Sequence, residues 1–322
     1  MRKQVFLHTV FLFLFIITAM VFPADKIKIG FLRQLEIQPF IKQTEGAIKV
    51  LEENGYTTDK AEIIQTTANG KMAEIKNIID TMKKNKVKVI IPIGTSVSLE
   101  VLKLVKDIPV VACVTYGETL KEAKTQFKLG NNYTAALMYV PALPVLKIAL
   151  KIKKITTIGM MYNEKEDNAK KEMAMLIQGC KNLKLQSKTF PYSNENAITN
   201  TFKKMLDSGV ECIVIPKDTL LAQHMDEIKP QIYAKKMLAL ALDDAPADRD
   251  LAVISLTAGN EEVGMLLGKK AVEILKGKKP AEIKMEALDK FYVTVNLKVA
   301  KIIGINIPVD VVRTANRIIK EE

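Results

Sequence analysis

The 322-residue sequence contains no tryptophan and only three cysteines, and 6% of its residues are aromatic. So few aromatic rings argue against a stacked carbohydrate-binding platform. Three cysteines cannot form a disulfide framework, and without a C-x-x-C pair or a Cys/His cluster we expect no metal site. Cys113 and Cys212 lie in apolar strand-like runs and Cys180 lies in a helical pattern. We therefore expect three buried free thiols.

Motifs that carry catalysis are also missing. The sequence has no G-x-S-x-G nucleophile elbow, no P-loop and no G-x-G-x-x-G dinucleotide motif. Only one histidine follows the N-terminal apolar run, His224, and it lies in a helical pattern without an accompanying Ser or Cys motif. We therefore expect no enzymatic activity, no catalytic residue and no cofactor.

The charge balance is strongly basic, with 48 lysines and arginines against 36 aspartates and glutamates, a formal net charge of +12. The lysines are scattered at the spacing of helix surfaces rather than gathered in one arm. No run that combines aromatic and basic residues accompanies them. We interpret the lysines as solvated helix faces and expect no nucleic-acid partner.

One long apolar run is present, at the N-terminus. Two basic residues precede an apolar stretch over 11–22, which the sequence Pro-Ala-Asp follows. This pattern is typical of a secretory signal peptide, and the run is short for a membrane span, which needs about 20 residues. We predict that residues 1–24 are a signal peptide and that the protein is periplasmic or otherwise extracytoplasmic. An uncleaved anchor is the alternative, because Phe22 is bulky for a cleavage site; no cysteine follows to accept a lipid.

Beyond the signal, apolar strand-like runs alternate with helical patterns. The strand-like runs are 27–32, 62–66, 87–93, 108–114, 155–161, 185–190, 211–215 and 237–242. Near-continuous apolar strands separated by helices are typical of parallel sheets covered on both faces. About four such units precede residue 116 and four follow residue 154. The pattern predicts an α/β protein of two doubly wound parallel-sheet lobes, with a ligand cleft between the carboxyl ends of their strands.

The composition of the connecting segments suggests boundaries. We expect an N-terminal lobe over 25–130, a C-terminal lobe over 131–255 and a segment over 256–322 that is shared between the lobes. Within the shared segment, the expected elements are a crossover helix over 261–276, a strand over 291–297 and a helix over 309–319.

Polar residues follow several of the predicted strands and form the candidate site. They are Gly94, Thr95, Ser96, Asn163, Glu166, Asn168, Asp218, Thr219 and Asp243. Hydroxyls and free N–H groups at a helix N-terminus suit a carboxylate or phosphate, and aspartates suit an ammonium group. Each of these side chains could equally cap the next helix, so both interpretations stay open.

Two C-terminal stretches resemble a known family. ILKGKKPAEI at 274–283 and VNLKVAKIIGINIP at 295–308 are similar to a Lys-Gly-Lys-Pro turn, an Asn-Leu-Lys helix start and a G-x-x-I-P turn. These features occur in ABC transporter substrate-binding proteins of the family whose best-described members bind tryptophan and related aromatic amino acids. Further similar stretches are 36–56, 91–115, 158–169 and 215–222.

The resemblance implies a type I periplasmic-binding fold, a small-molecule ligand and an ABC permease as partner, and we expect a monomer. It adds Glu36, Thr115, Tyr116 and Tyr162 to the candidate ligand-binding residues. Where the family often continues with Asp-Pro, Thr115 is followed by Tyr-Gly. The stretch TAGNEEVG at 257–264 lacks the Asp and Tyr of the family's G-x-D-Y-x-x-L-G. The ligand is therefore expected to be an amino acid or a similar organic ion, aromatic or not.

Two functions fit this expectation. The first is a solute-binding protein that delivers its ligand to an ABC importer by domain closure. The second is a ligand-sensing module for a membrane signalling partner, since one fold serves both. A cytoplasmic sugar-responsive repressor of the same fold is disfavoured by the signal peptide and by the missing helix-turn-helix segment.

Overall fold

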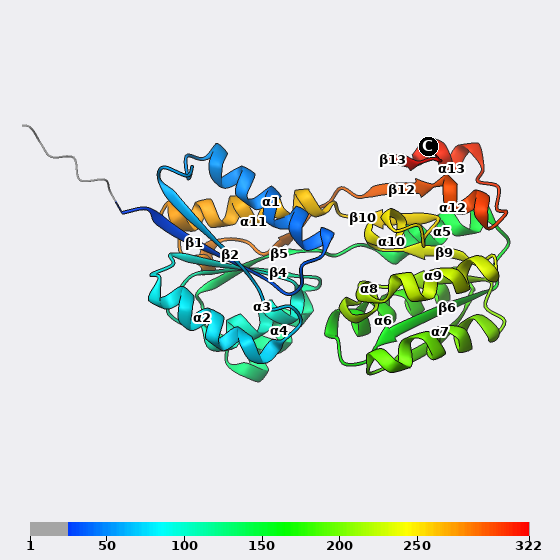
Figure 1. Cartoon of the computed structure of the whole chain (residues 1–322), viewed down its shortest axis with the longest axis horizontal. Coiled ribbons are helices and arrows are strands. Elements are labelled where there is room, and N and C mark those ends of the chain that lie inside the picture. Colours follow the sequence, from blue (N-terminus) through cyan, green and yellow to red (C-terminus); the bar gives the residue numbers. More distant parts are fainter. Residues whose placement is uncertain (1–24, 322) are drawn as a thin grey trace, which may run out of the picture.

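The apolar runs of the sequence become the buried strands of the structure. The computed structural model describes residues 25–321, and the predicted signal peptide over 1–24 lies outside them. Within the described residues, no helix has both the length and the apolar character to cross a membrane. These residues form two α/β lobes side by side, each built around its own sheet (Figure 1).

The first lobe contains a six-stranded parallel sheet in the order β11-β5-β4-β3-β1-β2. Its strands are β1 (Ile27–Arg33), β2 (Ala61–Thr67), β3 (Val89–Ile93), β4 (Val110–Val114), β5 (Tyr133–Leu137) and β11 (Glu286–Ala287). Its helices are α1 (Gln38–Glu53), α2 (Ile75–Lys84), α3 (Thr95–Leu104), α4 (Gly117–Phe127) and α11 (Asn260–Leu275). Helices α1 and α11 cover one face, and α2, α3 and α4 cover the other.

The second lobe contains a seven-stranded sheet in the order β13-β12-β10-β9-β8-β6-β7. Its strands are β6 (Thr157–Asn163), β7 (Gln186–Tyr192), β8 (Cys212–Ile215), β9 (Leu238–Ala241), β10 (Ile254–Thr257), β12 (Tyr292–Asn296) and β13 (Arg317–Ile319). Its helices are α5 (Ala142–Ile152), α6 (Asp167–Asn182), α7 (Ile198–Asp207), α8 (Thr219–Gln223), α9 (Met225–Ala234), α10 (Ala245–Asp248), α12 (Leu297–Ile302) and α13 (Val309–Thr314). Strand β12 pairs antiparallel with β10, and the other strand pairs of this sheet are parallel, so β12 and β13 run opposite to the other five strands.

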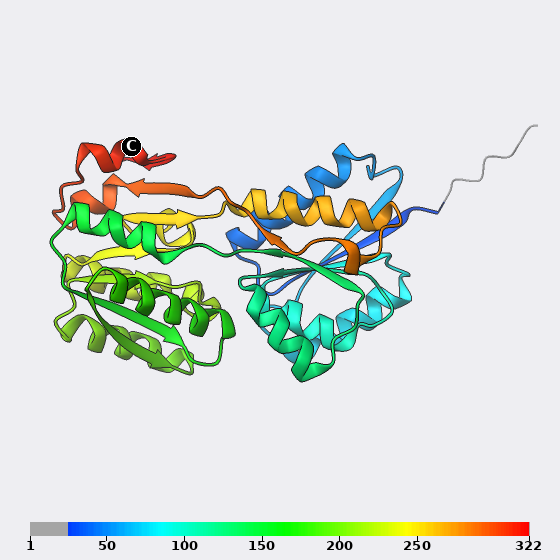
Figure 2. The ribbon, with the colours of Figure 1, turned by 180° about the vertical axis from the view of Figure 1, so that it is seen from behind.

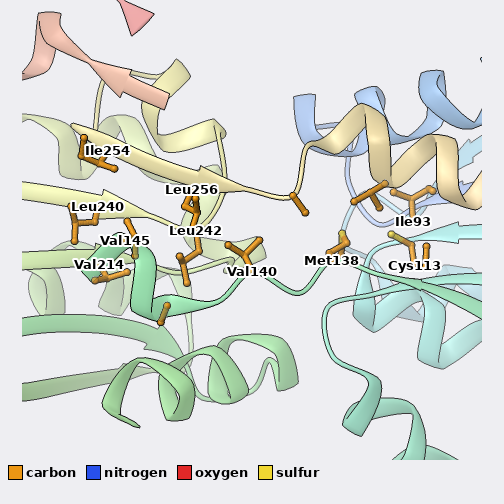
Figure 3. Close-up of a cluster of buried hydrophobic side chains, with 14 of the residues drawn as sticks. Ile93, Cys113, Met138, Val140, Val145, Val214, Leu240, Leu242, Ile254 and Leu256 are labelled. Carbon is orange, nitrogen blue, oxygen red and sulfur yellow. The ribbon is translucent and has the colours of Figure 1, made fainter. Parts of the chain in front are cut away.

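The chain passes between the lobes three times, after β5, after β10 and between β11 and β12 (Figure 2). One hydrophobic cluster extends from the first sheet to the second through the first crossing, where Met138 and Val140 are buried (Figure 3). The two lobes therefore share part of their core. The three cysteines are buried and free, with Cys113 on β4 and Cys212 on β8, as expected.

Two details differ from the sequence-based expectation. Residues 131–137, expected in the second lobe, contain β5, which pairs with β4 in the first sheet, so the crossing comes after them. The helix expected over 309–319 ends at Thr314, and the chain then forms β13 beside β12. Without β13, backbone N–H and C=O groups along the edge of β12 would lack hydrogen-bond partners, and pairing with β13 provides those partners.

Helices α1 and α11 approach so closely that only glycine fits at their contact. A Cβ added to Gly264 would lie 2.1 Å from the carbonyl oxygen of Gln43, and one on Gly46 would lie 2.2 Å from that of Glu261. A Cβ on Gly268 would also meet the α1 backbone, at 2.6 Å. The contact holds the late helix α11 against the first lobe.

We expect Gly264→Ala to lower the free energy of unfolding by about 2–3 kcal/mol, because the added methyl forces the two helix backbones apart. Gly117→Ala is the matched control. That glycine begins α4, where a Cβ would meet its nearest atom at an ordinary 3.4 Å, so its effect should stay within about 0.5 kcal/mol. Urea denaturation of both variants measures the difference, and equal stabilities would contradict this account of the contact.

Candidate ligand-binding cleft

A cavity of about 330 Å³ lies between the lobes. The first lobe lines it with the turn after β1, the N-terminal end of α1, the start of α3 and Thr115 after β4. The second lobe lines it with the turns after β8 and β9 and with parts of α8, α9 and α10. Because strands in a parallel sheet end at the same edge, these turns from distant parts of the chain converge on one cleft.

Eight of the thirteen residues expected in the site line this cavity: Glu36, Gly94, Thr95, Thr115, Asn168, Asp218, Thr219 and Asp243. Five do not: Ser96, Tyr116, Tyr162, Asn163 and Glu166. The sequence pattern predicts a helix over 97–106 after a turn of Gly94, Thr95 and Ser96, but α3 begins two residues earlier, at Thr95. Ser96 is therefore inside the helix, and Thr95 lines the cavity while Ser96 does not. Tyr116 is buried at the N-cap of α4.

Sequence reasoning missed several lining residues. Thr95 and Asp218 were expected in the site because they are polar residues that follow a predicted strand. Gln34 follows β1 in the same way, so this strand-end rule could have found it as well. Phe40 and Gln43 lie on α1 and carried no signal beyond the helical pattern. Lys217 is adjacent to Asp218, but its direction depends on the fold of the turn.

The start of α3 offers free donors to the cavity. Its N-cap, Gly94, has φ +114° and no side chain to satisfy the first N–H groups of the helix. A Cβ there would lie 2.7 Å from Gln34 Oε1, so glycine keeps this wall open. Thr95 Oγ1 accepts from Thr115 N at 3.1 Å and lies 3.2 Å from Thr115 Oγ1. Two hydroxyls that share one hydrogen bond leave one O–H free, so this end can bind an anion.

The opposite wall carries carboxylates. Asp218 is 4% exposed and caps α8, with Oδ1 accepting from Leu220 N and Leu221 N. Its Oδ2 accepts from Asn163 N at 2.7 Å. Asp243 Oδ1 accepts from Ala245 N at the start of α10. The capping interpretation is therefore confirmed for Asp218, although both aspartates also line the cavity.

Side chains from α6 and the turn before it hold the Asp218 turn from behind. Glu166 Oε2 accepts from Thr219 N at 3.0 Å, and Asn168 Nδ2 donates to Lys217 O at 2.5 Å. Burial, and then the charge of Asp218, raise the pKa of Glu166 to about 7. Glu166 thus positions a cavity residue without lining the cavity itself.

Glu172 is a second buried acid behind this turn. It is 1% exposed, and its Oε2 accepts from Lys217 N at 2.5 Å, but among residues 25–321 no donor reaches its Oε1. Burial raises its pKa to about 7, against the opposing effect of the Lys217 charge. Lys217 Nζ donates to Met138 O at the first crossing, 3.1 Å away.

Direct contacts join the lobes around the cavity. Polar pairs between the lobes include Gln34 with Thr219, Lys42 with Asp248, Thr119 with Asp167 and Glu122 with Lys171. Gln34 Nε2 donates to Thr219 Oγ1 at 3.2 Å, and both residues line the cavity. The lobes are therefore in contact across the cleft, in a closed arrangement.

We expect the stability difference between Glu172→Gln and the unaltered protein to grow with pH. Because the folded-state pKa of Glu172 is raised, the folded protein binds the proton more tightly than the unfolded chain, and this stabilisation is lost as pH rises through about 7. Glutamine has no proton to lose, so the variant should gain about 2 kcal/mol relative to the unaltered protein between pH 5 and pH 8. Denaturant unfolding at both pH values measures this.

The control is Glu164→Gln, which changes an exposed glutamate in the turn after β6. Its difference from the unaltered protein should not vary between the two pH values. A pH-independent difference for Glu172→Gln would contradict the assignment.

A family model described as ABC transporter substrate binding protein matches residues 28–319. A curated protein of Rickettsia prowazekii without an assigned function is 23% identical over 288 residues, 89% of this chain and 88% of that protein.

Two solved structures are similar over their whole length. One is an ABC domain from Streptococcus pneumoniae in complex with L-Trp, with a TM-score of 0.83, 22% identity, and coverage of 92% of this chain and 100% of that one. The other is a conserved domain protein from Vibrio cholerae, with a TM-score of 0.84, 19% identity, and coverage of 91% and 100%. The expected fold of two parallel-sheet lobes is confirmed.

Proposed function

The chain belongs to the ABC transporter substrate-binding protein family and has the type I periplasmic-binding fold. From this premise we propose that it is the extracytoplasmic solute-binding protein of an ABC importer. It binds a small organic ion, an amino acid or a similar molecule, between its lobes and delivers it to a permease in the cytoplasmic membrane. It acts by domain closure as a monomer, without chemistry.

The observation that carries this proposal is the opposed polarity of the cavity walls. The start of α3 presents uncapped N–H groups and a hydroxyl on one side, while Asp218 and Asp243 stand on the other. A ligand with a carboxylate at one end and an ammonium at the other satisfies both walls. Hydrogen bonds to charged groups contribute about 1.5–3 kcal/mol each, so a few of them suffice for tight binding.

The rest of the lining explains why a side chain can be accommodated. Phe40, Met225 and Pro246 give the cavity an apolar part, and its volume of about 330 Å³ falls in the range of small-ligand pockets. Burial of an apolar ligand group there contributes about 25 cal/mol for each Å² removed from water. An aromatic amino acid is one ligand that this combination suits, and the Streptococcus pneumoniae structure contains one.

Closure follows from the way in which the lobes are joined. The three crossing segments are the only covalent links between the lobes among residues 25–321, so rotation about them opens the cleft. A ligand that contacts both walls stabilises the closed form by its differential affinity. The Gln34–Thr219 contact forms only when the walls meet.

We expect ligand to compact the protein in solution. Small-molecule mass spectrometry on denatured, freshly purified protein identifies the ligand, which is then added back to stripped protein during X-ray scattering. The radius of gyration should fall because the lobes close on the ligand. If no small molecule is released and no amino acid from a full panel changes the scattering, the proposal is wrong.

We expect Thr95→Ala to weaken binding of that ligand about tenfold, since one hydrogen bond to a charged group is lost. Ser96→Ala, one residue along the same helix but outside the cavity lining, is the matched control and should change affinity less than twofold. Calorimetry measures both. A loss for Thr95→Ala no larger than that for Ser96→Ala would contradict a hydrogen bond between Thr95 Oγ1 and the ligand.

A further inference from the structure

The charge of the cavity opposes the charge of the protein. The chain has a formal net charge of +12, yet two carboxylates, Asp218 and Asp243, line the second-lobe wall of the cavity. Two more, Glu166 and Glu172, lie directly behind that wall, where they accept from the backbone N–H groups of Thr219 and Lys217. Within residues 25–321, none of the four forms an ion pair with a lysine, arginine or histidine. The cleft therefore carries carboxylates that have no ion-pair partner among the described residues, in a chain that is basic as a whole.

The other charged lining residues are already neutralised. Glu36 pairs with Arg33 at 3.0 Å, and Arg249 pairs with Asp226 at 2.6 Å. Asp248 contacts Arg317. None of these three lining residues therefore offsets the four carboxylates.

One cation remains on this wall, and it does not balance them. Lys217 Nζ donates to Met138 O rather than to a carboxylate, and its charge acts on Glu172, which it keeps closer to the ionised form. Glu166 and Glu172, whose pKa values are raised to about 7, are only partly ionised at neutral pH. The single charge of Lys217 therefore leaves this side of the cavity negative, and increasingly so as the pH rises.

A buried oxygen without a donor points the same way, independently of the charge count. Glu172 Oε1 is enclosed, and among residues 25–321 it accepts no hydrogen bond. Buried acceptors of this kind are rare in folded proteins, because leaving one unsatisfied costs about 1–3 kcal/mol. The charges of Asp243 and Asp218 act on Glu172, so the acid belongs electrostatically to the cavity wall. Among the described residues, Glu172 Oε1 thus lacks a donor on the same side of the cavity as the unpaired carboxylates.

We propose that the ligand carries net positive charge: a small organic molecule with more ammonium groups than carboxylates, seated with a cationic group against Asp218 and Asp243. This rests on the proposed function and specifies its substrate class. A metal ion does not fit this role, since no three acidic, histidine or cysteine side chains in residues 25–321 converge to hold one. A basic amino acid and a diamine share the required chemistry and differ in the carboxylate that would meet the start of α3.

Binding of such a ligand should release protons. The pKa of Glu166 is raised to about 7, and Asp218 at the start of α8 and Tyr192 at the end of β7 are the titratable groups that face it. A bound ammonium favours the ionised carboxylates and lowers their pKa values. Affinity for the cation should therefore rise from pH 6 to pH 8, because at the lower pH protons compete with it.

The test is calorimetry of stripped protein with L-lysine, L-arginine, cadaverine, L-norleucine and L-tryptophan at pH 7.5. L-Norleucine differs from L-lysine only by lacking the side-chain amine. We expect the tightest-binding cation to bind at least tenfold more tightly than L-norleucine. A preference for L-lysine over cadaverine then identifies a basic amino acid, and the reverse identifies a diamine.

Tighter binding of L-norleucine or L-tryptophan than of every cation would overturn the inference and leave the proposed function intact. Failure of the whole panel to bind would overturn the inference as well, while mass spectrometry of a released anionic or neutral ligand would still support solute binding. The two failures are therefore distinguishable.

Variants locate the cationic group. Asp243→Asn keeps the oxygen that accepts from Ala245 N but removes the charge, so affinity for the cation should fall about tenfold and the ratio to L-norleucine should shrink. Asp207→Asn makes the same change in net charge on the exposed end of α7 and should leave both affinities unchanged. Equal losses in the two variants would show that the effect comes from the net charge of the protein. They would contradict binding of the cationic group beside Asp243.

Discussion

The contact between α1 and α11 is the constraint on which the architecture depends. Their backbones meet where Gly46 and Gly264 leave no side chain between them, so a helix from late in the chain completes the first lobe. That return makes the second and third crossings necessary. It also brings Asn260 to Gln43, whose Nε2 donates to Asn260 Oδ1 at 2.8 Å beside the cavity. The helix contact thus determines both the connection of the lobes and part of the cavity wall.

The cleft is built from two kinds of strand-end turn with opposite electrostatic character. The first lobe contributes a helix start whose N–H groups are uncapped, and the second contributes acids whose ionised forms are poorly solvated. Neither arrangement favours the folded state by itself, since free donors and buried carboxylates both lose hydration. Their proximity across one cavity becomes favourable when a molecule of complementary charge is placed between them.

The sequence predicts the fold well because each buried strand is marked by a run of several apolar residues. It predicts poorly the direction in which an individual side chain points. The apolar runs for β1, β3, β4 and β8 are buried on both sides and stand out from the residues around them. Strand β5 reads as a connecting segment, because glycine and asparagines precede it and prolines follow it.

In the site, the strand-end rule found Thr95 and Asp218. Whether a neighbour such as Ser96 also faces the cavity depends on the residue at which the helix begins, which a pattern of apolar residues does not resolve. Glu172 could not be found by the strand-end rule, for another reason. It lies inside α6 rather than in a turn, and only the packing of that helix brings it behind Lys217. The return of α11 to α1 also has a consequence for the order of synthesis. One face of the first sheet has only α1 to cover it until residue 275 has emerged, so the N-terminal lobe cannot complete its core until most of the chain has been made.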